Sequence, residues 1–152
     1  FQGVETNLAF SPFAGFKAQI GYTYLDASNE APGSFNPLTG QPGNVLGTST
    51  LDNEPEHKFM AAVSYAIGGG STLLADYQYV ADSFAVARNQ IDTLELADYH
   101  LLNLGVTQDI GNAYQLYGRV ENVLDENYES SFGFPETGRV FFIGLRAKLG
   151  PG

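Results

Sequence analysis

The feature that most constrains this chain is an alternation of apolar and polar residues that recurs in seven separate runs. In the last run, Phe141, Ile143 and Leu145 alternate with more polar or smaller neighbours. Successive side chains of a β-strand point to opposite faces, so each run predicts a strand with one apolar face. Helical periodicity is hard to find. The runs cover residues 4–10, 16–25, 58–65, 73–80, 99–108, 113–124 and 141–149.

The connections between the runs alternate between short and long. Short turns are predicted at residues 11–15, at Gly68–Gly70 and at Gly111–Asn112. The long connections are 26–55, 81–98 and 125–138, and the segment Gln90–Leu96 is the one place where a helical turn is predicted. Short turns at one end and long loops at the other are typical of outer-membrane β-barrels. The runs also match the ~9–11 residues with which a tilted strand crosses a bilayer.

Charge is scarce and unevenly placed. Charged residues make up 16% of the 152 residues, below the ~25% of soluble domains. Most of the 17 acidic residues belong to the long connections, and the net charge of −10 argues against nucleic-acid binding. Cysteine is absent, which excludes disulfides and thiolate metal sites. The charged residues of the runs all occupy the positions that alternate with the apolar ones, and so belong to the polar face of each strand: Glu5, Lys17, Lys58, Asp76, Arg119, Glu121, Arg146 and Lys148.

Two classes of fold share this alternation. A soluble antiparallel β-sandwich, acting as a binding module, would bury the apolar face and expose the polar one. An all-β transmembrane barrel would turn the apolar face to lipid. Tyr and Phe near the strand ends, as in interfacial girdles, and a polar face rich in Gly, Asn, Gln and Thr favour the barrel.

Several segments resemble a known family. They are Gly3-Val4-Glu5, GYTYLDA at 21–27, PEHKF at 55–59, VENVLDENYE at 120–129 and GFPETGRVFFIGLRAKL at 133–149. Their order and spacing resemble the C-terminal part of TonB-dependent outer-membrane receptors. The resemblance implies a 22-stranded barrel with an N-terminal plug. Residues 1–149 would be the C-terminal portion of that barrel wall and residues 150–152 a tail.

The function implied by this resemblance is import of a scarce nutrient, such as a ferric siderophore or cobalamin, across the outer membrane of a Gram-negative bacterium. The expected partners are outer-membrane lipid and lipopolysaccharide, the rest of the barrel and its plug, TonB through the plug, and the small nutrient itself. Neither a cofactor nor an enzymatic activity is expected.

Seven strands do not close the even-numbered barrel that is usual for single-chain bacterial proteins. We therefore expect the last seven strands of a larger barrel. The alternative is an eighth strand hidden in Asp82–Leu96, which would give a small complete barrel with an adhesive or structural role.

The candidate sites follow from these faces and loops. Asp76 and Glu121 are expected near Arg119, in a lumenal polar network that holds wall and plug together. The sequence Glu54-Pro55-Glu56-His57 lacks the spacing of a ligand pair, so no metal site is predicted. The acidic loops would repel a bare anionic ligand. Aromatic loop residues are the candidate ligand contacts, with packing inside the loops as the alternative for each: Phe35, Phe84, Tyr128, Phe132 and Phe134.

Overall fold

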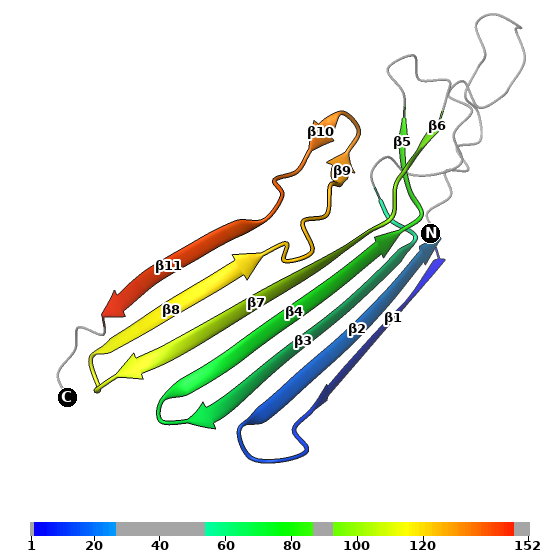
Figure 1. Cartoon of the computed structure of the whole chain (residues 1–152). Helices are drawn as coiled ribbons and strands as arrows, with labels where there is room; N and C mark the ends of the chain where they lie inside the picture. The colour runs from blue at the N-terminus through cyan, green and yellow to red at the C-terminus, as the bar shows by residue number, and fades with distance from the viewer. Residues whose placement is uncertain (1, 27–53, 87–92, 148–152) are drawn as a thin grey trace, which may run out of the picture.

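The computed structural model of the chain describes residues 2–26, 54–86 and 93–147. Its main feature is an antiparallel sheet of seven strands, in the order β1-β2-β3-β4-β7-β8-β11 (Figure 1). Neighbours in this order are consecutive long strands of the chain, so the seven predicted strands are confirmed. They are β1 (Gln2–Phe10), β2 (Phe16–Asp26), β3 (His57–Gly68), β4 (Ser71–Ala81), β7 (Tyr99–Ile110), β8 (Tyr114–Glu121) and β11 (Val140–Ala147).

The two ends of the sheet differ. Short turns join β1 to β2, β3 to β4 and β7 to β8 at one end, which we call the turn end. Two small hairpins extend from the opposite end, which we call the loop end (Figure 1). One hairpin consists of β5 (Ser83–Val86) and β6 (Thr93–Leu96), and the other of β9 (Glu129–Ser131) and β10 (Phe134–Pro135).

The helical turn expected over Gln90–Leu96 is wrong for its described part. Residues 93–96 form β6, which pairs with β5, and residues 90–92 lie outside the described residues. Pairing with β5 provides backbone partners for this segment, and its Leu96 is buried, at 6% exposed.

The alternative folds are not observed. Each hairpin pairs only with itself, so the described residues add no eighth strand to the main sheet, whose edges are β1 and β11. No second sheet covers the apolar residues of β11 among the described residues, and Phe141 and Ile143 are 71% and 81% exposed. A sandwich would bury such residues. No helix among the described residues is long and apolar enough to cross a membrane.

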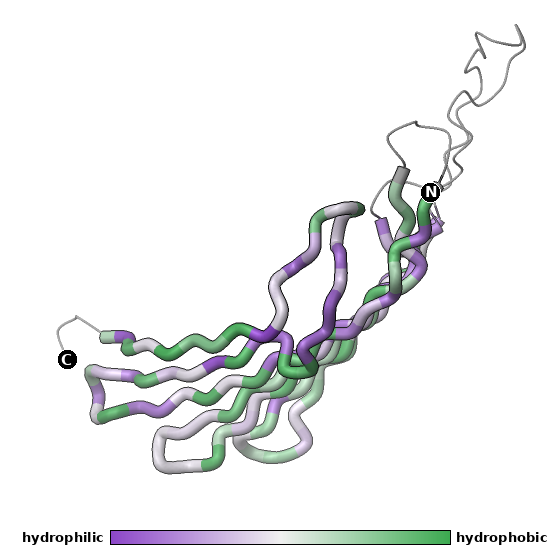
Figure 2. Tube along the Cα trace, turned by 45° about the horizontal axis from the view of Figure 1, so that its top comes forward, coloured by the Kyte–Doolittle hydropathy of each residue, from purple (hydrophilic) through white to green (hydrophobic). Residues whose placement is uncertain are grey.

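The register sorts the side chains into two faces. Leu8 lies opposite Ile20, Ile20 opposite Ala61, and Ala61 opposite Tyr77. We call the face of these residues the apolar face, and the other, which carries Asp76 and its neighbours, the polar face. Figure 2 shows the resulting alternation of hydropathy along the strands. The observed pairing therefore preserves the faces predicted from the sequence.

Aromatic rings mark both ends of the apolar face. Phe13, Phe16 and Tyr65 form a cluster at the turn end, with ring centroids 4.9–6.2 Å apart. Tyr22 lies nearer the loop end of β2, next to the ring of His57. Between Phe16 and Tyr22 the same face carries only Ala18 and Ile20. Six residues of strand span roughly 20 Å, comparable to the ~25 Å apolar band of membrane barrels.

The polar face is the concave side of the sheet. Hollows of about 550 and 270 Å³ both open on it. The larger is lined by Lys17, Asp76 and Arg119, and the smaller by Gln19 and Gln78. A barrel wall curves around its interior, so this face corresponds to the inside of a barrel.

Candidate functional site

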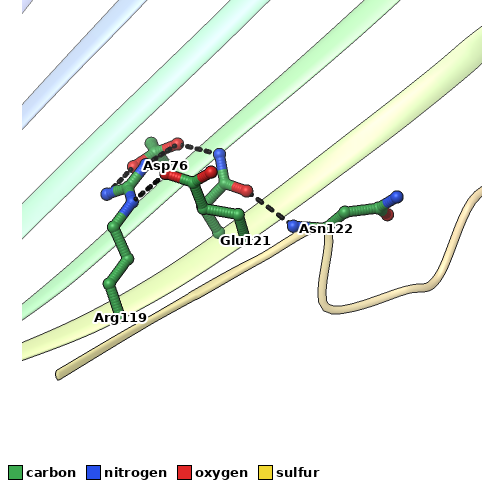
Figure 3. Close-up of polar contacts among 5 residues, drawn as sticks. Asp76, Arg119, Glu121 and Asn122 are labelled. Atoms are coloured by element: carbon green, nitrogen blue, oxygen red, sulfur yellow. Dashed lines mark hydrogen bonds and ion pairs between the residues drawn. The ribbon is translucent and has the colours of Figure 1, made fainter. Parts of the chain in front are cut away.

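An ion-pair network lies at the middle of the polar face (Figure 3). The guanidinium of Arg119 on β8 donates to both carboxylate oxygens of Asp76 on β4, at 3.1 and 3.4 Å. Its Nε donates to Oε1 of Glu121 at 2.9 Å. All three side chains are between 35% and 44% exposed, so solvent partly screens the pairs. The three residues that the sequence placed on one face are thus in direct contact.

The side chain of Arg119 crosses a neighbouring strand. Arg119 lies opposite Gly105 on β7, and its guanidinium reaches Asp76 on β4, two strands away. Asn103, two residues from Gly105 on the same face, donates from Nδ2 to Asp76 at 2.5 Å. Asn103 was missed by sequence reasoning. It could have been found from its place in the fifth run, where it lies on the same face of the strand as Gly105.

The other predicted polar-face residues stand apart from this network. Arg146 on β11 donates to Oε1 of Gln115 at 3.1 Å, and Gln115 donates to Asp109, all near the turn end. Lys148 lies outside the described residues. The remaining three form no salt bridge within the described part of the chain: Glu5, Lys17 and Lys58.

A clamp built on Asn122 fastens the β8–β11 connection to the wall. Asn122 has a φ of 50°, in the left-handed region that Asn tolerates, and is 5% exposed. Its side chain donates to the carbonyl of Glu126 and accepts the N–H of Glu126, both at 2.9 Å. Its own N–H donates to Oδ1 of Asn103 at 2.8 Å. The clamp is therefore continuous with the ion-pair network through Asn103.

The far side of the same connection is tied to this turn. Asp125, with a φ of 58°, accepts the N–H of Arg139 at 3.0 Å. Arg139 in turn donates from Nε to the carbonyl of Val123 at 3.0 Å. We call Asn122, Asp125 and Arg139 the base clamp. The N-V-L-D and G-R segments of the sequence motifs, residues 122–125 and 138–139, thus have a structural role, because their contacts close the base of a loop.

The candidate ligand contacts lie in different surroundings. Tyr128 is half-buried against Tyr99, with ring centroids 4.4 Å apart. Phe132 and Phe134, in the β9–β10 hairpin, are 53% and 72% exposed. Phe84 is half-buried in β5 on the other hairpin, and Phe35 lies outside the described residues.

A hollow at the loop end brings some of these residues together. It measures about 350 Å³ and lies between β6 and the β9–β10 hairpin. Tyr128 and Phe132 line it from the hairpin side, and Glu95 lines it from β6. Burial, followed by the nearby carboxylates of Glu136 and Glu121, raises the pKa of Tyr128, so its phenol stays protonated well into the alkaline range.

His57 stands on the apolar face at the loop end. Its Nδ1 is 2.8 Å from the hydroxyl of Tyr22, and its Nε2 is 3.7 Å from the carboxylate of Asp82. Among the residues described by the structure, no three His, Cys, Asp or Glu side chains gather as a metal site would need. His57 therefore links two strands to the start of the β5–β6 hairpin.

Comparison with solved structures shows that the fold of this sheet is similar to part of several siderophore receptors. The siderophore receptor PiuA of Acinetobacter baumannii matches with a TM-score of 0.73 and 16% identity, over 94% of this chain and 21% of that chain. The ferric-catecholate import receptor Fiu of E. coli K12 matches with a TM-score of 0.70 and 19% identity, over 94% of this chain and 20% of that chain. FpvA of P. aeruginosa, solved with pyoverdine, matches with a TM-score of 0.68 and 20% identity, over 94% of this chain and 19% of that chain. At these identities the likeness concerns the fold, and the chain spans about a fifth of each receptor.

Sequence comparison gives the family directly. No curated protein sequence matches the chain. Residues 1–123 match the family described as TonB dependent receptor-like, beta-barrel. The match covers most of the seven-stranded sheet, from β1 through β8. The chain therefore belongs to the TonB-dependent receptor-like β-barrel family.

Proposed function

We propose that this chain forms part of the wall and the outer loops of a receptor that imports a scarce small nutrient through the bacterial outer membrane. A ferric siderophore or cobalamin is the class of nutrient. Membership of the TonB-dependent receptor-like family is the observation that carries the proposal. Siderophore receptors among the structural neighbours support the substrate class.

The two faces of the sheet suit this role. The apolar face, with aromatic clusters at both ends, would meet lipid, and lipopolysaccharide would surround the loop end. The concave polar face would line the interior and contact a plug, which TonB would rearrange. In this arrangement the network of Asp76, Arg119 and Glu121 braces the wall against the plug. The loops at the outer end would capture the nutrient.

Uptake by intact cells tests the proposal. The gene for the intact receptor is deleted, and entry of radiolabelled iron from a panel of chelates, and of cobalamin, is measured under limitation for each. Loss of uptake of one nutrient, restored by the intact gene but not in a strain without TonB, is the expected result. Undiminished uptake of every nutrient in the deletion strain would contradict the proposal.

Location is tested separately by membrane fractionation. The intact receptor is expected in the outer-membrane fraction, released only by detergent, and with a gel mobility that changes on heating. Recovery in the soluble fraction would overturn the membrane assignment. Normal localisation without any uptake defect would leave the assignment standing but refute the transport role.

A further inference from the structure

The hollow between β6 and the β9–β10 hairpin has the size of a ligand subsite. Its volume of about 350 Å³ lies within the ~300–1,000 Å³ range of small-molecule pockets. Lys58 of the polar face lies opposite Val80, and Val80 lies opposite Tyr99, so Tyr99 also belongs to the polar, concave face. Tyr128 packs on Tyr99, so the segment that lines the hollow leans over the concave side. A ligand entering the barrel from the loop end would pass this hollow.

The lining combines carboxylates with aromatic rings. Glu95 on β6 is exposed, and Glu129 contributes a second carboxylate, one oxygen of which accepts the N–H of Gly133. Tyr128 and Phe132 supply rings, and the described residues of the lining include no Lys or Arg. The negative face of an aromatic ring and a carboxylate both attract cations.

The surroundings strengthen this preference. Among the described residues of the β8–β11 connection, the only basic side chain is Arg139, and its Nε is held by the carbonyl of Val123. Three more carboxylates, those of Asp98, Glu126 and Glu136, lie on the segments flanking the hollow. Charges gathered at one end of a protein favour ligands of opposite sign in the adjoining cleft.

We propose that this hollow binds a cationic organic group, an ammonium or guanidinium, carried by the small ligand of the receptor. The inference rests on the proposed function and specifies the chemistry of its ligand. The cation would sit against the rings of Tyr128 and Phe132, with Glu95 as its counter-charge. The rest of the ligand, including any metal chelate, would extend over the concave face. A ligand with a compact triple negative charge would be disfavoured.

A matched pair of probes tests the inference on the intact receptor in detergent. One probe is a ferric trihydroxamate chelate that carries a free primary ammonium, and the other is its N-acetylated derivative. The two differ only at the charged group. A ferric tris-catecholate serves as the anionic probe, and cobalamin completes the panel. Binding is measured by quenching of intrinsic fluorescence and by calorimetry.

The ammonium chelate is expected to bind about tenfold more tightly than its acetylated form, the effect of one partly desolvated cation contact. Glu95→Gln and Tyr128→Leu are each expected to reduce this ratio towards one. Asp26→Asn removes a carboxylate at the end of β2, away from the hollow, and is expected to preserve the ratio. Heat-modifiable gel mobility verifies that every variant is folded.

The outcomes separate the inference from the function that it rests on. Binding of one nutrient without preference for the ammonium chelate, or with preference for the tris-catecholate, overturns the cationic subsite alone. An ammonium preference that survives Glu95→Gln and Tyr128→Leu also overturns it, because the cation is then recognised elsewhere. If neither any chelate nor cobalamin binds, the proposed function falls, and this inference falls with it.

Discussion

Adjacent alanines on β3 allow a direct test of which face meets lipid. Ala61 lies on the apolar face, opposite Ile20 and Tyr77, while Ala62 lies on the polar face, opposite Asp76. Replacing each by Lys introduces the same side chain at nearly the same height in the wall. Only the face differs. The pair therefore separates the effect of lipid exposure from the effects of size, charge and strand propensity.

The expected magnitudes follow from the position of Ala61. It stands four residues from Tyr65 at the turn end and two from Phe59 towards the loop end, within the apolar band. A Lys on the lipid face near the midplane costs about 2–4 kcal/mol. Ala62→Lys should cost close to nothing, because its ammonium would reach solvent and Asp76. The two variants should thus differ by a factor of about 30 to 900 in folding equilibrium.

Folding of the intact receptor into phosphatidylcholine vesicles measures the difference. The folded fraction is read from heat-modifiable gel mobility across a urea series. Ala61→Leu is the size control, and it should fold as well as the unmodified receptor because it adds only apolar surface. An equal loss for both Lys variants, or a larger loss for Ala62→Lys, would refute the assignment of the faces.

Two further predictions concern two glycines of the sheet and the ion pair of the polar face. Gly144→Ala should destabilise the receptor by about 1 kcal/mol, because a Cβ there collides with the ring of Tyr117, which is partly exposed and must move aside, whereas Gly118→Ala meets only ordinary contacts at 3.7 Å or more. Urea titration of both variants checks this, and equal stability would contradict it. A double-mutant cycle with Arg119→Met and Asp76→Asn should give a coupling of about 1 kcal/mol, modest because both side chains are partly exposed. A coupling near zero would mean that the pair does not brace the wall.

The wall was predictable because strand alternation has a period of two and every strand obeys it. Strand ends were less predictable. The sixth run was expected to continue to Leu124, but β8 ends at Glu121 because Asn122 adopts a left-handed conformation. That conformation is favoured by contacts with Asn103 and Glu126, which the one-dimensional pattern does not show.

The candidate site was predictable only in part. The alternation along each strand placed Asp76, Arg119 and Glu121 on one face. That the Arg119 side chain crosses β7 at Gly105 to reach Asp76 depends on the register between strands, which alternation does not give. The β9–β10 hairpin was missed, and the strand considered within Asp82–Leu96 was considered as an eighth strand of a barrel and not as a separate β5–β6 hairpin. Strands of two to four residues carry too little alternation to identify. For the same reason, sequence alone did not bring Glu95 next to the aromatic residues of the β9–β10 hairpin.

The base clamp has a consequence for the segment that it encloses. Asn122, Asp125 and Arg139 fasten both ends of one surface loop where it leaves the wall. Residues 127–137 lie between these fixed points and include the β9–β10 hairpin. The contacts that fasten the loop to the wall thus lie outside the hairpin itself. In the proposed function, a hairpin of different chemistry in this place would change the contacts with the ligand and leave those at the base of the loop as they are.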